Sequence, residues 1–210
     1  PHRVMVQASY SSPKYWNGWT STTIAVIYNG FSGSRYSLTM NEKQDFNGDG
    51  QKGNSLLYIP TDEELNKMTF VDNIDEETGK VIMTAAQSRE AFKQWIENDS
   101  YAKNHRGQYA ERNSNLSKWE HEIDLHLAQT IYNIEGMGKL EFTFDIINFA
   151  NMLNKKWGAS YESAYNLSPL TLKEFAADGT TPLYYYNNAE IQKSDISSRW
   201  HCQVGVRLTF

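Results

Sequence analysis

The sequence predicts an all-β fold, an antiparallel segment of a transmembrane β-barrel with long extracellular loops, one of which contains a short helix. Three features predict this fold. Several segments alternate apolar and polar residues, the connections between them are either short or very long, and aromatic residues gather near the segment ends. The 210 residues include 13 Tyr and 6 Trp, and such residues form the girdles of membrane barrels.

The N-terminal part of the chain contains two alternating segments. In residues 3–11, every second side chain from Val4 to Tyr10 is apolar, which predicts a strand with one apolar face. Residues 12–18 predict a short turn that carries aromatic side chains. The alternation returns from Trp19 to about Thr39, where we expect one long strand.

Residues 40–118 lose the alternation and are polar and rich in Asn, Asp and Gly. We expect a long loop with internal structure there. One helix is predicted inside it, because Thr84 and Gln87 have the spacing of a capping box. The apolar residues that follow fall on one helical stripe, namely Ala91, Phe92, Trp95 and Ile96.

Three further strands are expected, at residues 119–130, 140–146 and 200–210, with a second long polar loop at 151–198. The first of these strands carries a polar side chain at every second position, namely Glu120, Glu122, Asp124 and His126. In a barrel, apolar faces contact lipid and polar faces line a wet lumen. We expect these side chains to face lipid: Ile123, Leu125, Leu127, Phe142, Phe144, Val204 and Val206. We expect these to face the lumen: Glu122, Asp124, Asp145 and Arg207.

A soluble antiparallel sandwich also alternates and is the alternative fold. The charged strand faces and the unequal connection lengths favour the barrel. Five strands cannot close a barrel, and unpaired strand edges are not tolerated in lipid. We therefore expect residues 1–210 to be a piece of a larger barrel.

Composition excludes several classes of protein. No run approaches the roughly 18 apolar residues that a membrane-spanning helix needs. Cys202 is the only cysteine, which excludes an internal disulfide and a cysteine-based zinc site. The net charge of −5 disfavours nucleic-acid binding, and we expect no nucleic-acid partner. We also expect no enzymatic activity, because no nucleophile–base constellation is present and carboxylates about 7 Å apart occur on any polar strand face.

A calcium loop is predicted at residues 45–51, which have the D-x-N-x-D-G spacing of calcium-binding loops. The expected ligands are the side chains of Asp45, Asn47 and Asp49 and the carbonyl of Gln51. Leu56 stands where a bidentate Glu would complete an EF-hand, so another loop would have to complete the shell. The alternative is a polar turn that needs no metal.

Three stretches and the terminal Phe210 together resemble the C-terminal barrel region of TonB-dependent outer-membrane receptors, in the Oar-like and SusC-like branch. The stretches are residues 45–50 followed by 56–60, residues 105–113, and residues 145–154 with Trp157 and Gly158. Phe210 follows apolar residues at every second position, as in the C-terminal signal of outer-membrane barrels. The resemblance covers essentially the whole chain.

The resemblance implies the last five or so strands of a barrel of about 22 strands, in the outer membrane of a Gram-negative bacterium. It implies import of a large nutrient, such as an oligosaccharide, peptide or chelate. The implied partners are the rest of the barrel and its plug, the TonB complex, outer-membrane lipid and a surface lipoprotein lid. The turn at 12–18 would be periplasmic, and the loops at 40–118 and 151–198 extracellular. A surface binding or adhesion module without transport is the alternative function.

Two loop clusters have open interpretations. Arg106, Glu111 and Arg112 could form a salt-bridged clamp that holds their loop, or could contact substrate. The residues Tyr184, Tyr185 and Tyr186, with Trp157 and Tyr161, could stack on carbohydrate or peptide or could belong to an interfacial girdle.

Overall fold

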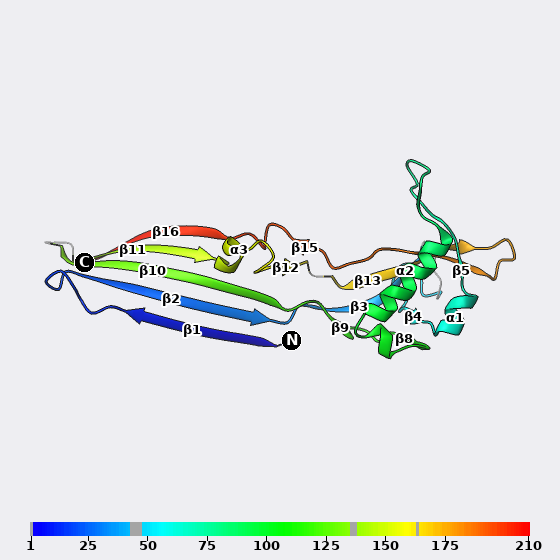
Figure 1. The fold of residues 1–210 in the computed structure, drawn as a ribbon, viewed down its shortest axis with the longest axis horizontal. Helices are drawn as coiled ribbons and strands as arrows, with labels where there is room; N and C mark the ends of the chain where they lie inside the picture. Colours follow the sequence, from blue (N-terminus) through cyan, green and yellow to red (C-terminus); the bar gives the residue numbers. More distant parts are fainter. Residues whose placement is uncertain (1, 43–47, 135–137, 163) are drawn as a thin grey trace. The chain divides into compact units, whose positions relative to one another are not determined.

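The computed structural model describes residues 2–42, 48–134, 138–162 and 164–210 (Figure 1). The fold is mostly β, as predicted, and strands far outnumber helices. No helix among these residues has the length and apolar composition that crossing a membrane requires. The chain forms two compact units. The sheet unit comprises Pro1–Gly33, Ser117–Glu162 and Gln192–Phe210, and the inserted unit comprises Ser34–Leu116 and Ser163–Ile191.

The sheet unit is built on one antiparallel sheet in which each strand lies beside the preceding one (Figure 1). Its order is β1-β2-β10-β11-β16, so the prediction of about five antiparallel strands is confirmed, although β2 is shorter than expected. Within the described residues the sheet does not close, and β1 and β16 form its edges. The strands are β1 (Arg3–Ser11), β2 (Thr20–Phe31), β10 (Glu120–Ile134), β11 (Gly138–Ile147) and β16 (His201–Thr209).

The register of this sheet places apolar side chains in continuous rows across all five strands. Directly opposite residues share a face, so a row can be followed through the strand pairs. One such row consists of Tyr10, Ile24, Leu127, Phe144 and Val204. Their exposed fractions range from 39% for Phe144 to 70% for Val204, so this face is left largely uncovered.

The opposite face is polar, and its side chains form hydrogen bonds and ion pairs between neighbouring strands. The row of directly opposite residues next to the apolar row above lies on this polar face and consists of Ser9, Ala25, His126, Asp145 and Gln203. His126 Nδ1 lies 2.5 Å from Asp145 Oδ1. All the side chains that we expected to face lipid lie on the apolar face, and all those expected to face the lumen lie on the polar face.

A second polar crosslink on this face is centred on Glu141 of β11. Its carboxylate pairs with Lys139 at 3.2 Å and with Arg207 of β16 at 3.5 Å. Thr130 Oγ1 of β10 donates a hydrogen bond to the same carboxylate at 3.2 Å. The carboxylate therefore joins three adjacent strands on the polar face.

After β11, the chain makes a tight connection that begins at Asn148, which has a left-handed backbone with φ of 56°. The Asn148 side-chain amide donates to the carbonyls of Gly158 and Ser198, at 2.8 and 2.9 Å. A Cβ at Gly158 would lie 1.8 Å from Asn148 Oδ1, so only glycine fits there. The short elements of this region are α3 (Phe149–Leu153), β12 (Ser160–Tyr161) and β15 (Lys193–Ser194).

The prediction of one strand from Trp19 to Thr39 is wrong. Strand β2 ends at Phe31, and a separate strand, β3, begins at Arg35 in the inserted unit. Gly33 lies at the break, where a Cβ would come within 1.7 Å of Ser117 Oγ. The alternation continues on both sides of this short break, so the pattern alone does not reveal it.

The inserted unit combines most of the two segments, 40–118 and 151–198, that we expected to be separate loops. Its sheet has the order β5-β14-β13-β3-β9, in which β13 runs parallel to β3 and β14 runs parallel to β5. These parallel pairs join residues from 34–116 to residues from 163–191, so the two loops fold as one body. The strands are β3 (Arg35–Glu42), β5 (Thr69–Phe70), β9 (Asn115–Leu116), β13 (Asn166–Phe175) and β14 (Pro182–Tyr186).

The predicted helix is confirmed as α2 (Ala85–Asn98), and its capping box between Thr84 and Gln87 is present. It packs on β5, β13 and β14, with Phe92 and Ile96 fully buried. The core around them includes Leu38, Leu57, Ile59, Leu65, Phe70, Leu170, Leu172 and Tyr186. The remaining elements are β4 (Tyr58–Ile59), α1 (Asp62–Lys67), β6 (Asn73–Ile74), β7 (Val81–Met83), η1 (Ala102–Asn104) and β8 (Gln108–Tyr109).

This core predicts a large stability effect at one position of α2. Phe92→Ala should destabilise the inserted unit by about 3–5 kcal/mol, because it removes a fully buried ring and leaves a cavity. The matched exposed variant Gln94→Ala should change stability by less than about 0.5 kcal/mol. Hydrogen exchange of the α2 amides in urea would measure both effects, and equal effects would contradict this packing.

Candidate functional site

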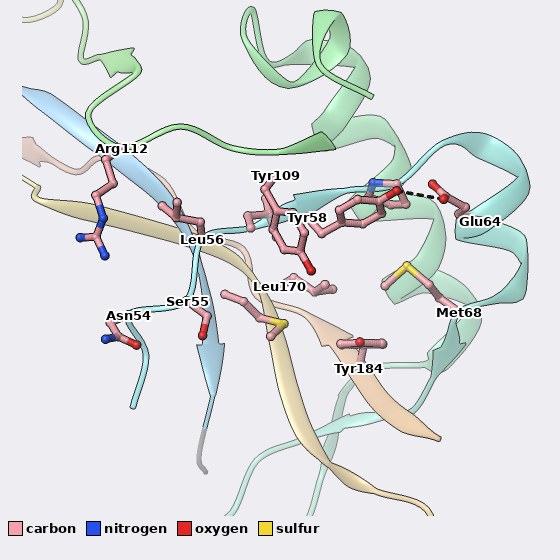
Figure 2. Close-up of a pocket in the computed structure, with 13 residues that line it drawn as sticks. Asn54, Ser55, Leu56, Tyr58, Glu64, Met68, Tyr109, Arg112, Leu170 and Tyr184 are labelled. Atoms are coloured by element: carbon pink, nitrogen blue, oxygen red, sulfur yellow. Dashed lines mark hydrogen bonds between the residues drawn. The ribbon is translucent and has the colours of Figure 1, made fainter. Parts of the chain in front are cut away.

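A pocket of about 610 Å³ lies within the inserted unit (Figure 2). Its volume lies in the range of about 300–1,000 Å³ that ligand pockets occupy. Most of its wall is aromatic or aliphatic, and four polar side chains reach it. The lining residues are Met40, Asn54, Ser55, Leu56, Leu57, Tyr58, Pro60, Glu64, Met68, Tyr109, Arg112, Leu170 and Tyr184.

Two of the stretches that carry the family resemblance build one wall of this pocket. The 56–60 and 105–113 stretches meet in the antiparallel pair β4–β8, where Tyr58 lies opposite Tyr109. The two rings pack edge to face with centroids 5.1 Å apart. Leu57 also bonds to both neighbours, since its N–H donates to Leu38 O and its carbonyl accepts from Ala110 N. The backbone therefore fixes both rings at the pocket.

Glu64 of α1 anchors the tyrosine wall. Tyr58 Oη donates to Glu64 Oε1 at 2.9 Å, and this hydrogen bond raises the pKa of Tyr58 (Figure 2). The other carboxylate oxygen accepts the backbone N–H of Thr61 at 2.9 Å and completes a capping box. That backbone hydrogen bond, followed by the bond from Tyr58, lowers the pKa of Glu64. Glu64 is thus an ionised anchor whose oxygens are already occupied.

The polar side chains at the opposite side of the pocket are not fully occupied (Figure 2). The Asn54 side-chain amide donates to Asp49 Oδ2 at 2.7 Å, whereas Asn54 Oδ1 is buried and has no hydrogen-bond partner among the described residues. Ser55 Oγ donates to Glu42 Oε1 at 2.7 Å. Within the described part of the chain, the Arg112 guanidinium takes part in no ion pair. This side of the pocket therefore offers a cation and an acceptor to a ligand.

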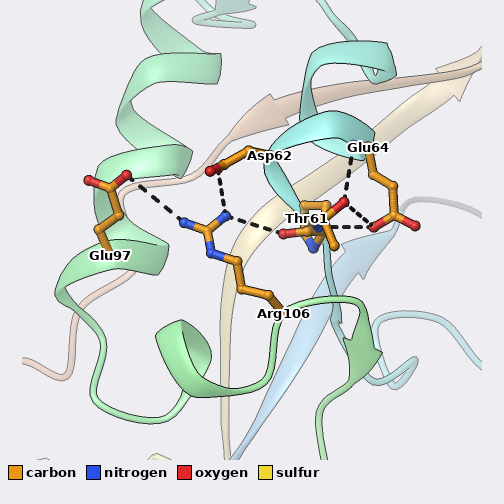
Figure 3. Close-up of polar contacts among 6 residues, drawn as sticks. Thr61, Asp62, Glu64, Glu97 and Arg106 are labelled. Atoms are coloured by element: carbon orange, nitrogen blue, oxygen red, sulfur yellow. Dashed lines mark hydrogen bonds and ion pairs between the residues drawn. The ribbon is translucent and has the colours of Figure 1, made fainter.

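Arg106 makes the structural clamp of this region (Figure 3). Its guanidinium donates to Asp62 Oδ1 at 3.1 Å and to Pro60 O at 3.3 Å, and it lies 4.0 Å from a Glu97 carboxylate oxygen. The clamp that we expected among Arg106, Glu111 and Arg112 is therefore replaced by one between Arg106 and acidic residues of α1 and α2. Arg112 lines the pocket instead.

The expected calcium loop lies partly outside the described residues, because Asp45 and Asn47 belong to the segment 43–47, which the structure does not describe. The Asp49 carboxylate accepts hydrogen bonds from Gln51 N and from the Asn54 side chain. Leu56 forms a β-bridge with Thr39. Among the described residues, no three His, Cys, Asp or Glu side chains gather as metal ligands. Calcium binding at this loop stays a prediction.

The charged face of β10 has structural partners. Glu120 Oε1 accepts the Tyr161 N–H at 3.1 Å, and Asp124 Oδ1 accepts the Asn148 N–H at 2.9 Å. His126 pairs with Asp145 on β11. These contacts tie the face to neighbouring segments.

The structure divides the expected aromatic cluster between the two units. Tyr184 lines the pocket and Tyr186 belongs to the core of the inserted unit. Trp157 and Tyr161 belong to the sheet unit, where they line a smaller hollow with Trp119 and His121. Only Tyr184 of this cluster is therefore part of the candidate site.

Comparison with known proteins adds no assignment, since no family model, no curated protein and no solved structure matches the chain. The sequence did not predict the pocket, although the resemblance had drawn on the stretches 56–60 and 105–113 that form one of its walls. The spacing of Thr61 and Glu64 is a capping-box signal that could have located α1.

The lowered pKa of Glu64 predicts a pH-dependent α1. The pKa of Glu64 is lower in the folded state than in the unfolded state, so its ionised form stabilises the fold. This stabilisation is fully present above the unfolded pKa, and it is lost as the pH falls through the folded pKa. Glu64→Gln should therefore increase hydrogen exchange of residues 62–67 at pH 6, and its difference from the unmodified protein should shrink in more acidic solution. The exposed neighbour Glu63 provides the control, and Glu63→Gln should have little effect at either pH. A difference for Glu64→Gln that grew with acidity would contradict the assignment.

Proposed function

We propose that the chain forms part of the barrel of an outer-membrane TonB-dependent transporter that imports a large nutrient. In this proposal the sheet unit is a piece of the barrel wall and the inserted unit lies on the extracellular side. The observation that carries the proposal is the sheet itself, which has one exposed apolar face and one crosslinked polar face.

The size of the apolar face supports a lipid environment. Five strands, each about 4.8 Å wide and about 30 Å long, give a face on the order of 700 Å². The largest apolar patch on a typical soluble monomer is about 300–600 Å². A strand needs about 9–11 residues to cross a membrane. β1 and β16 have 9 residues and β11 has 10, while β2 and β10 are longer, with 12 and 15.

The polar face supports a wet lumen. The His126–Asp145 pair and the Glu141 crosslink bring charges across neighbouring strands, and such groups need water or partners. The unclosed edges of the sheet support a larger barrel, because backbone N–H and C=O groups at an unpaired strand edge cannot form hydrogen bonds in lipid. Further strands of the same barrel would pair with β1 and β16.

The connections support the orientation of the wall. The 12–19 connection between β1 and β2 is short, and residues 135–137, outside the described part of the chain, join β10 to β11. The chain leaves the sheet after β2 and after β11 and returns to it at β10 and β16, and these long connections contain the inserted unit and the segment around α3. Membrane barrels have short periplasmic turns and long extracellular loops. The plug, the TonB complex and a surface lipoprotein lid are the partners that the proposal implies.

A charge placed on each face of β11 tests the membrane assignment. Phe144→Lys should destabilise the protein in lipid by about 2–4 kcal/mol if it lies near the bilayer midplane, because the ammonium would be buried in hydrocarbon. Thr143→Lys, its neighbour on the polar face, should have a mild effect. Urea unfolding in liposomes would measure both. Equal destabilisation by the two variants would contradict a lipid-facing and a lumen-facing side.

Transport and surface binding are separated by an uptake measurement. Cells that carry the whole protein should accumulate labelled nutrient only while energy coupling through TonB is intact. Uptake that persists without this coupling would contradict transport, and surface binding without any uptake would establish the adhesion alternative.

A further inference from the structure

We propose that the pocket of the inserted unit binds the C-terminal residue of a peptide, with an apolar side chain in the pocket and the terminal carboxylate on Arg112. The assignment deepens the proposed import function and rests on it for its biological use. It invokes three features of the pocket: an apolar wall, a cation and a buried acceptor, the last two without partners among residues 2–42, 48–134, 138–162 and 164–210.

The wall selects an apolar side chain. Met40, Leu57 and Leu170 come from three separate segments of the inserted unit and meet at this pocket. Tyr109 and Tyr184 add ring surface, and aromatic rings contribute large contact areas at little entropic cost (Figure 2). Methionine adapts its shape to different apolar groups. The pocket therefore accepts a large aliphatic or aromatic side chain.

The guanidinium selects an anion. Arg112 lines the pocket and has no ion-pair partner in the described residues, whereas Arg106, six residues earlier in the chain, is held by Asp62. A planar guanidinium binds a carboxylate through two parallel hydrogen bonds. Arg112 is thus the group in this pocket that can take a terminal carboxylate.

The acceptor, Asn54 Oδ1, selects a ligand that carries an N–H group next to its terminal carboxylate. Asn54 Oδ1 is buried and finds no donor in the part of the chain that the structure describes, and a buried acceptor without a donor costs free energy. Figure 2 places Asn54 and Arg112 on the same side of the pocket. The last residue of a peptide carries an amide N–H, a carboxylate and a side chain on one Cα, which matches the three features together.

Two other ligand classes match less well. A sugar ring would place hydroxyl groups against Met40, Leu57 and Leu170, where they would lose hydrogen bonds to water without replacement. A fatty acid has a carboxylate and an apolar chain, but it has no N–H to satisfy Asn54 Oδ1.

Calorimetric titration of the whole purified protein in detergent tests the assignment with the tripeptide Gly-Gly-Phe as probe. Amidation of its C-terminus and replacement of Phe by Ser should each weaken binding about tenfold or more. Arg112→Gln should weaken binding of the free acid by roughly 10- to 100-fold and leave the amidated peptide unaffected, because the amide lacks the charge that Arg112 pairs with. Lys103→Gln removes another exposed cation of the inserted unit outside the pocket and should leave binding unchanged.

Equal binding of acid and amide, or full affinity in Arg112→Gln, would overturn the assignment. Binding of palmitate or of a glucose oligomer in preference to Gly-Gly-Phe would overturn it as well. Arg112 is exposed, and an unchanged α2 exchange pattern would verify that its variant is folded. The titration needs neither lipid nor energy coupling, so loss of peptide binding leaves the barrel assignment standing, and failure of uptake leaves the pocket assignment standing.

Discussion

The register of the five-stranded sheet is the constraint on which the rest of the structure depends. Because side chains alternate along a strand, a slip of one residue in β10 would move Asp124 and His126 to the apolar face and Leu125 and Leu127 to the polar face. The His126–Asp145 pair and the Glu141 crosslink exist only in the observed register. The alternating faces and the cross-strand ion pairs therefore specify the same alignment.

The inserted unit depends on a different constraint, the closure of distant segments by parallel strand pairs. Asn166 pairs with Ser37 across more than one hundred residues, and Leu183 pairs with Thr69. These pairs bring Tyr184 and Leu170 to the segment that carries Tyr58, and the pocket forms where they meet. Its wall therefore includes buried core residues such as Leu57 and Leu170, and its polar side carries Arg112 and an amide oxygen that has no partner in the described residues.

Local features of this fold could be predicted from the sequence, and non-local ones could not. The strands and α2 follow from period-two alternation and from the Thr84–Gln87 spacing, which are properties of neighbouring residues. The parallel pairs, the break after Phe31 and the clamp between Arg106 and Asp62 join residues that carry no mutual signal in one sequence. The pocket was missed for this reason, although sequence analysis had singled out Arg112 and the 56–60 stretch.

The central claim is that one face of the sheet contacts lipid and the other contacts water. Single cysteines placed at 122–127 in a Cys202→Ser background, in protein reconstituted into liposomes, would test it most directly with a membrane-impermeant maleimide. The account predicts labelling at positions 122, 124 and 126 and protection at 123, 125 and 127, because these sets lie on opposite faces. Labelling that does not alternate along β10, or that alternates in the opposite sense, would contradict it.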